Sequence, residues 1–319
     1  MSAPEAAAPQ SAARAPAGAP EIGQLAGLGL LIAITFFWGI NWPAMKTAVG
    51  EIPPWTFRVI CLAIGGAGML AIARLGGLRF RIPRGELGPL LITGLFNITI
   101  WHICSAAGLV HISASRASII AFTMPLWATL LAVPLLGERL TWRAVAGLAL
   151  GLAGLAALVL PHADALLADP LGPLLMLLAA MSWAVGTVLA KHYRFTMPVS
   201  VFTGWQILLG GLPILAGMLI FERDFQPARV GVAAWGAALY AALIPTIFCQ
   251  WGWFKLVRSF PAIAVSIGTL MIPVLGVLSS ALALGEPVGL PEVAALALIL
   301  AALFIVLILP ALGKGGRRA

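Results

Sequence analysis

The chain carries one pattern of residues twice, and this internal repeat constrains its fold more than any other feature. Serine, proline and glutamate recur in a single register displaced by 148 residues, so that Ser118-Ile119, Pro125 and Gly137-Glu138 are matched by Ser266-Ile267, Pro273 and Gly285-Glu286. Matches of alanine or leucine are common in apolar segments, but matches of these residue types in one register are not. The repeat predicts two halves of similar architecture.

The composition places both halves in a membrane. Hydrophobic residues make up 61% of the chain and charged residues 9%, whereas a soluble domain has roughly 25% charged residues. The net charge of +8 is spread over short clusters between apolar segments, which argues against nucleic acid as a partner. The three cysteines lie within apolar segments, so neither a disulfide framework nor a metal site is indicated.

The apolar segments predict an all-α integral membrane protein with ten transmembrane helices. A helix needs about 20 apolar residues to cross the hydrocarbon core, and the segments of this kind cover approximately residues 24–47, 54–74, 87–109, 113–136, 142–160, 171–192, 197–221, 231–255, 260–284 and 288–310. The predicted domains are a disordered cytoplasmic tail, a first five-helix repeat, a linker, a second five-helix repeat and a basic cytoplasmic tail, over residues 1–23, 24–160, 161–170, 171–310 and 311–319.

The distribution of Lys and Arg predicts the orientation, because cytoplasmic loops carry the excess of these residues. One set of alternate loops, with the two tails, holds fourteen of them: Arg14, Arg74, Arg79, Arg81, Arg84, Arg139, Arg143, Lys191, Arg194, Lys255, Arg258, Lys314, Arg317 and Arg318. The other set holds four, which are Lys46, Arg116, Arg223 and Arg229. Both termini are therefore expected in the cytoplasm, and this requires an even number of helices.

Five helices per repeat give the two halves a predicted symmetry. An odd number of crossings means that the second repeat enters the membrane in the opposite orientation to the first. Such inverted repeats are typical of secondary transporters, whose substrate binds near the membrane midplane between the halves. The arrangement favours alternating access, because exchanging the conformations of the two halves converts an outward-open state into an inward-open one.

Polar and tryptophan side chains at membrane depth are the candidates for the substrate-binding site. Buried polar groups are costly in lipid and usually face protein or a water-filled cavity, and membrane tryptophans usually lie at the interfaces. The candidates are Trp38, Asn41, Trp101, His102, Trp183, Trp205, Gln206, Tyr240 and Gln250. They predict an aromatic-lined site without fixed charge, in which His102 and Gln250 are equivalent in the repeat. The alternative for each residue is packing against a neighbouring helix.

Acidic side chains are absent from the middle of every predicted helix. Glu138 and Glu286 follow Gly137 and Gly285, which have the positions of helix-ending glycines. Each glutamate is expected to begin the next helix, where a carboxylate suits the N-terminal dipole. Together with Pro125 and Pro273, these glutamates are assigned as hinge or structural residues. The hydroxyl groups of Ser118 and Ser266 are expected to bond to carbonyls of their own helices.

Two ionisable residues within the predicted helices leave alternatives open. Arg58, near the start of the second helix, either extends to the membrane surface or meets a substrate carboxylate. Proton-driven transporters commonly relay through an intramembrane Asp, Glu or His, and of these only His102 is available at mid-depth. Transport is therefore expected to be uncoupled or weakly proton-linked through His102.

Several motifs of the chain resemble the drug/metabolite transporter superfamily, of the EamA type. They are Trp38-Gly39-x-Asn41-Trp42, Phe57-Arg58, and the segment from Ser113 to Pro125-Leu126-Trp127 with Gly137-Glu138. The corresponding residues of the second repeat, Pro273 and Gly285-Glu286, belong to the same pattern. The resemblance spans about residues 24–310. It implies ten helices in two inverted repeats and export of small metabolites from the bacterial inner membrane. The aromatic-rich helices are most similar to the exporters of aromatic and other neutral amino acids.

Other functions compete with amino-acid export. A multidrug exporter for lipophilic cations would need a mid-membrane carboxylate, and sugar-phosphate transport would need Lys or Arg at mid-depth. An intramembrane enzyme would need a nucleophile–base pair or a metal cluster, which four scattered histidines do not provide. We therefore expect no enzymatic activity, no metal and no cofactor. The expected partners are amino-acid substrates and membrane lipid, and a monomer is compatible with the pattern.

Overall fold

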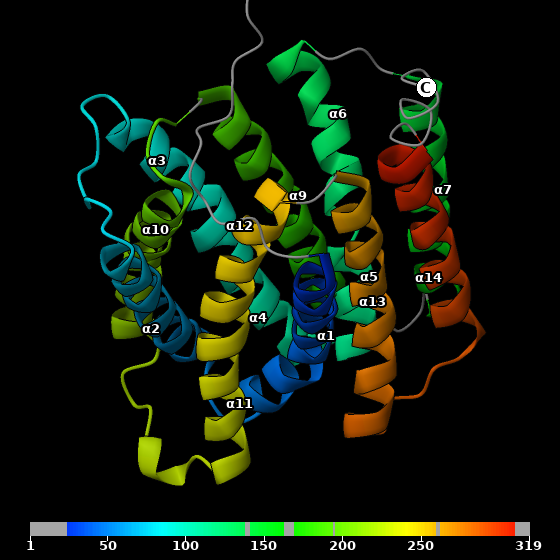
Figure 1. The fold of residues 1–319 in the computed structure, drawn as a ribbon. Helices are drawn as coiled ribbons and strands as arrows, with labels where there is room; N and C mark the ends of the chain where they lie inside the picture. Colours follow the sequence, from blue (N-terminus) through cyan, green and yellow to red (C-terminus); the bar gives the residue numbers. More distant parts are fainter. Residues whose placement is uncertain (1–23, 138–140, 163–168, 194, 260–261, 310–319) are drawn as a thin grey trace, which may run out of the picture.

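The computed structural model describes residues 24–137, 141–162, 169–193, 195–259 and 262–309 (Figure 1). Both predicted tails, most of the predicted linker and the predicted hinge residue Glu138 lie outside these ranges. The described residues form helices joined by short connections and contain no strand. Seven helical segments are long and apolar enough to cross a membrane, and three shorter apolar helices accompany them in the described ranges.

In the described residues, the first half of the chain contains seven α-helices, α1 to α7, and the short helices η1 and η2. Their bounds are α1 Gln24–Val49, α2 Pro54–Leu75, α3 Leu87–Gly94, η1 Leu95–Ile100, α4 Trp101–His111, α5 Ala114–Ala121, α6 Met124–Leu136, α7 Trp142–Val159 and η2 Leu160–His162. Two membrane-length segments are composite, because α3, η1 and α4 run on as one span and α5 is followed by α6 after a short break.

The second half repeats this order with small differences. Its elements are α9 Leu171–Tyr193, α10 Val199–Phe221, η3 Pro227–Arg229, α11 Val232–Leu243, η4 Ile244–Cys249, α12 Gln250–Ser259, α13 Ala262–Leu284, α14 Leu290–Leu303 and η5 Phe304–Ile308. The span around Pro125 is interrupted between Ala121 and Met124, whereas its counterpart α13 continues through Pro273. The two prolines therefore occupy different local structures.

A π-helical turn interrupts the third span of each half. Leu95–Ile100 precedes Trp101 and His102 in the first half, and Ile244–Cys249 precedes Gln250 in the second. A π-helical turn inserts an extra residue and changes the direction of the side chains that follow, and such turns are frequent at functional sites. The two interruptions therefore set the directions of three candidate site residues.

The two halves pack against one another reciprocally. Helix α1 packs against α11 and α13 of the second half, and α9 packs against α4 and α6 of the first half. Helix α2 lies along α10, and α7 lies along α14. In Figure 1, α7 and α14 stand together at one side of the molecule and α2 and α10 at the other. Most candidate site residues lie on elements between these outer pairs, whereas Trp205 and Gln206 lie on α10 itself.

Glycines end two helices, as the sequence predicts, and they allow close packing in a third helix. Gly137 and Gly285 have φ values of 68° and 65°, in the left-handed region that favours glycine at a helix end. A Cβ added at Gly147 would lie 2.3 Å from Val306, and one at Gly154 would lie 3.2 Å from the carbonyl oxygen of Ala295. Small residues on α7 thus let it approach α14 closely.

A close crossing of α10 and the α3–η1 segment gives a test of the packing. A Cβ at Gly210 would lie 2.8 Å from the carbonyl oxygen of Gly94 and 2.7 Å from Cβ of Ile98. We expect Gly210→Ala to destabilise the protein by about 1–3 kcal/mol, because the backbones must separate. The measurement is the melting temperature of the purified protein in detergent.

The matched control is Gly236→Ala in α11, where an added Cβ meets nothing within 4 Å. Alanine is a better helix former than glycine by about 1 kcal/mol, so this variant should melt at the wild-type temperature or slightly above it. Equal melting temperatures for the two variants would contradict the close crossing.

Candidate substrate site

Two pairs of tryptophan rings join the halves in the interior of the bundle. Trp101 of α4 and Trp183 of α9 have ring centroids 5.2 Å apart. Trp38 of α1 and Trp253 of α12 have centroids 5.6 Å apart. Both separations and tilts are favourable for aromatic pairs. Three of the four tryptophans are predicted site residues, and Trp253 is a partner that the sequence analysis missed.

The indole and phenol groups beside these pairs are bonded to backbone. Trp38 Nε1 donates to the carbonyl of Pro245, in η4, over 3.3 Å. The hydroxyl of Tyr240 donates to the carbonyl of Phe37 over 2.6 Å. Both bonds connect α1 to the third span of the second half. They fix the orientation of Trp38 and of its neighbours on α1.

A chain of polar contacts runs across α1, α2 and α4, and α1 and α4 also carry Trp38 and Trp101. Asn41 Nδ2 donates to Met45 Sδ over 3.0 Å, and Arg58 Nη2 lies 3.9 Å from the same sulfur. Arg58 Nη2 also donates to Ser105 Oγ over 2.7 Å, and its Nε donates to the carbonyl of His102 over 2.8 Å. We call these five residues the polar chain.

The polar chain settles one of the alternatives for Arg58. Its side chain is 4% exposed, so it turns into the protein and does not extend to the membrane surface. Two other atoms of the chain are unusual, because Asn41 Oδ1 and His102 Nδ1 are buried and have no hydrogen-bond partner among the described residues. Met45 and Ser105 are members that sequence reasoning missed, since neither is distinctive in an apolar helix.

The remaining predicted site residues are more scattered. Trp205 Nε1 donates to the carbonyl of Phe80, and its ring packs with the loop between α2 and α3 rather than with the tryptophan pairs. Gln206 is buried, and its Nε2 has no partner among the described residues. Gln250 is half-buried at the start of α12. The structure therefore does not bring Trp205 to the pairs.

Asn97 is a further interior polar residue that the sequence analysis overlooked. Its Nδ2 donates to the carbonyl of Trp183 over 3.2 Å and lies 3.4 Å from Thr187 Oγ1. A Cβ at Gly186 would lie 2.1 Å from Asn97 Oδ1. The amide thus fits against a glycine of α9 and holds the segment that carries Trp183. Its mid-helix position was the signal that could have identified it.

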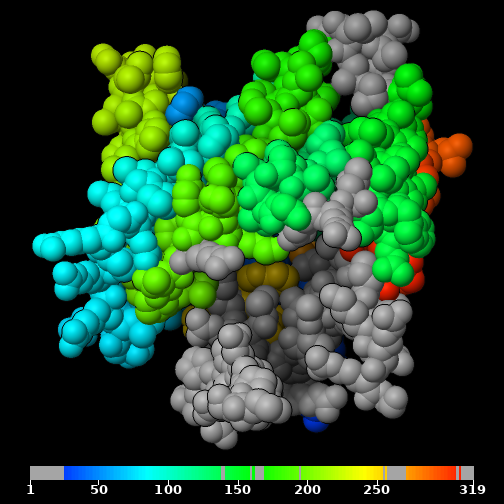
Figure 2. All heavy atoms as spheres, turned by 90° about the horizontal axis from the view of Figure 1, so that it is seen from above, coloured from blue at the N-terminus to red at the C-terminus, as the bar shows by residue number. Residues whose placement is uncertain are grey.

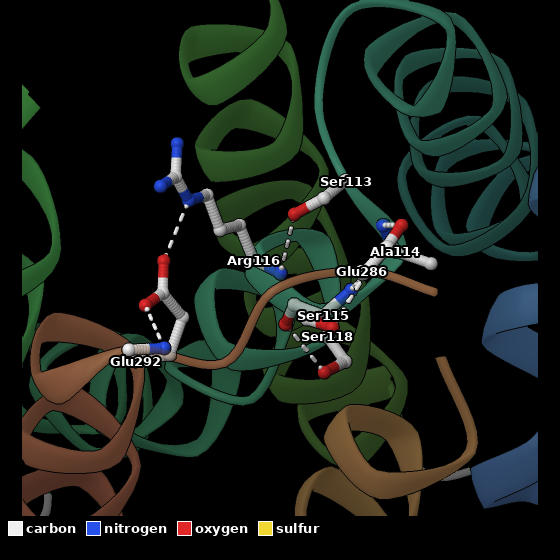
Figure 3. A network of polar contacts seen from close by, with 8 residues as sticks. Ser113, Ala114, Ser115, Arg116, Ser118, Glu286 and Glu292 are labelled. Carbon is white, nitrogen blue, oxygen red and sulfur yellow. Dashed lines mark hydrogen bonds and ion pairs between the residues drawn. The ribbon is translucent and has the colours of Figure 1, made fainter. Parts of the chain in front are cut away.

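Glu286 occupies a different position from the one expected (Figure 3). Its Oε1 accepts from the backbone N–H of Ala114 over 2.7 Å, and its Oε2 accepts from Ser115 N over 2.9 Å and Ser115 Oγ over 2.6 Å. The prediction that Glu286 begins the next helix was wrong, because the carboxylate caps α5 in the other half. Glu292 bonds the N-terminus of α14 instead, at Gly289 N. The hydroxyl of Ser118 bonds to Ser115 O, as predicted.

Other carboxylates make the same kind of contact on this face of the molecule. Glu222, after α10, accepts from Trp55 N and Thr56 N at the start of α2, over 3.0 Å and 2.7 Å. Glu51, after α1, accepts from Gly231 N at the start of α11 over 2.6 Å. Every one of these acceptors lies in one half and its donors in the other. We call the face that carries them the cap face, which is at the bottom of Figure 1.

An ion pair adds to the cap face. Arg116 Nε lies 2.9 Å from Glu292 Oε1, again between the two halves. On the opposite face, the contact of this type found in the described residues is Glu86 with Thr196 N, over 3.1 Å. Figure 2 shows that opposite face, with α3 in cyan and α6 in green at its rim and a gold-coloured part of the second half lying deeper between them. The halves are thus more firmly joined at the cap face.

Comparisons with known proteins agree with the repeat. The EamA-like transporter family matches the chain twice, at residues 25–160 and 170–308. The uncharacterized transporter YvbV of Bacillus subtilis is 30% identical over 285 residues, which is 87% of this chain and 90% of that protein. A probable amino-acid metabolite efflux pump of Salmonella typhimurium is 26% identical, over 87% of this chain and 93% of the pump.

Two further matches bear on location and fold. The uncharacterized inner membrane transporter YedA of Escherichia coli K12 is 28% identical, over 87% of this chain and 89% of that protein. A solved crystal structure with 23% identity covers 88% of this chain and 94% of its own, with a TM-score of 0.62, and this likeness concerns the fold alone. The chain is a multi-pass membrane protein and belongs to the EamA-like transporter family.

Proposed function

We propose that this protein exports aromatic and other neutral amino acids across the bacterial inner membrane, by alternating access between two inverted repeats of five helices. The observation that carries the proposal is the pair of tryptophan contacts between the halves, Trp101 with Trp183 and Trp38 with Trp253, beside the polar chain. Aromatic rings bind apolar and aromatic side chains, and polar groups fix the orientation of a ligand. The name of the Salmonella relative points to the same substrate class.

The inverted arrangement is supported by the reciprocal packing of the halves. The first span of each half packs against the third and fourth spans of the other, as a two-fold relation requires. The family also matches each half separately. Ten crossings follow if the three shorter apolar helices span the membrane with the seven longer ones. The excess of Lys and Arg then assigns the cap face to the outer side and both termini to the cytoplasm.

The cap face gives alternating access a physical basis. Glu51, Glu222 and Glu286 hold the halves together through helix N-termini on that face. When the halves rock apart there, water replaces the carboxylates at the exposed N–H groups, so these groups stay hydrogen-bonded in the open state. The opposite face then closes around the same central residues, which is how inverted repeats expose one site alternately.

The runner-up proposal is export of lipophilic cations. Such a substrate needs a carboxylate in the middle of the membrane, and the described helices contain one acidic residue, Glu292, in the first turn of α14. That carboxylate pairs with Arg116. The described residues therefore favour a zwitterionic or neutral substrate.

The central test is counterflow of labelled tryptophan in proteoliposomes. We expect trans-stimulated uptake by the wild type, and we expect Trp183→Ala to lower it by about tenfold, because an aromatic contact worth about 1–1.5 kcal/mol is lost on the substrate side. The control is Trp142→Ala, since that ring is 66% exposed at the start of α7. Uptake of a lipophilic cation but of no amino acid would overturn the proposal.

The pH dependence tests coupling through His102. If transport is uncoupled, an imposed pH gradient leaves the rate of tryptophan uptake unchanged in the wild type and in His102→Gln, which keeps a polar side chain of similar reach. If His102 carries a proton, the gradient accelerates the wild type alone. Acceleration of both proteins to the same extent would exclude His102 as the coupling residue.

The hydrogen bonds by which Glu286 caps α5 of the other half predict that this residue contributes to stability. Hydrogen bonds to a charged acceptor are worth about 1.5–3 kcal/mol each, and Glu286→Gln retains the shape but loses the charge. We expect a loss of about 1–3 kcal/mol, measured as a lower melting temperature in detergent. Asp224→Asn, an exposed loop carboxylate on the same face, is the charge-matched control. Equal melting temperatures of the two variants would contradict the stabilising role of Glu286 as a helix cap.

A further inference from the structure

Arg58 is a buried cation whose partners are all neutral. In the described residues its hydrogen bonds go to the carbonyl of His102, to Ser105 Oγ and to Met45 Sδ, and no carboxylate is among them. These bonds use Nε and Nη2, so Nη1 has no acceptor in the described part of the chain. A charged group buried within membrane helices is expensive unless it is paired, and such residues usually mark a site for a ligand.

The thioether of Met45 is a weak substitute for a counter-ion. Its sulfur receives both the guanidinium of Arg58, at 3.9 Å, and the amide of Asn41, at 3.0 Å. Sulfur is a weak acceptor, whereas a carboxylate forms short, charge-assisted and often bidentate bonds with a guanidinium. Methionine side chains are flexible and can withdraw from such a position. The contact therefore marks the place that a stronger acceptor would take.

The second half shows that the fold itself does not require a cation here. Helices α2 and α10 begin after Pro53 and Pro198, and their residues match at a displacement of 145, so the residue that corresponds to Arg58 on α10 is Thr203. Thr203 is 6% exposed, so a neutral side chain is buried at the equivalent position. A purely structural role would apply to both halves alike. The charge is thus specific to the polar chain of the first half.

Two buried acceptors complete the polar chain. Asn41 Oδ1 has no partner in the described residues, and neither has His102 Nδ1, which accepts when the ring proton is on Nε2. Asn41 lies one helical turn from Trp38, and His102 directly follows Trp101. A cation and two acceptors are therefore connected through hydrogen bonds, on helices that also carry Trp38 and Trp101.

We propose that the polar chain binds the charged head group of the substrate, with the carboxylate on Arg58 and the ammonium group on Asn41 Oδ1 and His102 Nδ1. This inference rests on the proposed amino-acid transport. The substrate carboxylate displaces Met45 from the guanidinium, and the side chain of the substrate reaches the tryptophan pairs. The site therefore recognises a zwitterion, and it rejects compounds that lack either charge.

The test compares three indole compounds as inhibitors of tryptophan counterflow: tryptophan, tryptamine without the carboxylate, and indole-3-propionate without the ammonium group. With the wild type, we expect both analogues to inhibit at concentrations at least about tenfold above that of tryptophan, a difference of about 1.4 kcal/mol. Equal inhibition of the wild type by all three compounds would overturn the head-group site, and this comparison needs no variant. Absence of transport of every neutral amino acid would overturn the proposed function instead.

The substitutions separate the two ends of the head group. Arg58→Gln removes the charge and keeps a polar side chain. This variant should bind tryptophan and indole-3-propionate about tenfold more weakly and bind tryptamine as the wild type does. Asn41→Leu, which has a similar volume, should weaken the binding of tryptophan and tryptamine but not that of indole-3-propionate. Melting temperatures in detergent establish that each variant is folded. The proposal would be contradicted by a folded Arg58→Gln protein that binds tryptophan as the wild type does. It would also be contradicted if this variant bound all three compounds more weakly to the same extent.

Discussion

Helix N-termini must find acceptors for their free N–H groups, and on the cap face the chain supplies these acceptors from the opposite half. Glu286 caps α5, Glu222 caps α2 and Glu51 caps α11. A carboxylate at this position accepts strong hydrogen bonds and also interacts favourably with the helix dipole. The same groups that complete the helices therefore hold the two halves together, and the rest of the bundle depends on that connection.

The placement of charge separates the proposed gate from the candidate binding site. Acidic side chains are concentrated at the ends of helices, where water can take over their bonds when the halves part. The centre contains tryptophan rings, amides and one guanidinium, for which lipid offers no partner. Opening the cap face therefore leaves its polar groups bonded to water, whereas the unsatisfied groups of the polar chain favour a ligand. These two properties are complementary in a transporter, which must bind its substrate and then release it.

The sequence predicted the large-scale organisation better than the local contacts. The 148-residue register, the apolar segments and the helix-ending glycines depend on local chemistry, which the sequence displays directly. The caps depend on which helix N-terminus lies opposite a carboxylate, and for Glu286 that is α5, 172 residues away from Ala114. The π-helical turns at Leu95–Ile100 and Ile244–Cys249 were not predicted, although Pro245 in the second of them is a residue type that disturbs helices.

The candidate site was also predicted only in part from the sequence. Mid-membrane tryptophans identified Trp38, Trp101 and Trp183, which lie in two pairs, but the same rule selected Trp205, whose indole bonds the loop at Phe80. The depth of a residue can be read from the sequence, but the direction of its side chain cannot. Arg58 was left between two alternatives for the same reason, and its burial at 4% exposure excludes the membrane surface.

The most direct measurement of the central claim is the distance between the halves on each face in a lipid bilayer. Spin labels at Val110 and Val232, which are 48% and 89% exposed, report on the cap face, and labels at Leu75 and His192 report on the opposite face. Alternating access predicts that added tryptophan changes the two distance distributions in opposite directions, one lengthening as the other shortens. Distributions that stay unchanged, or that lengthen together, would contradict it.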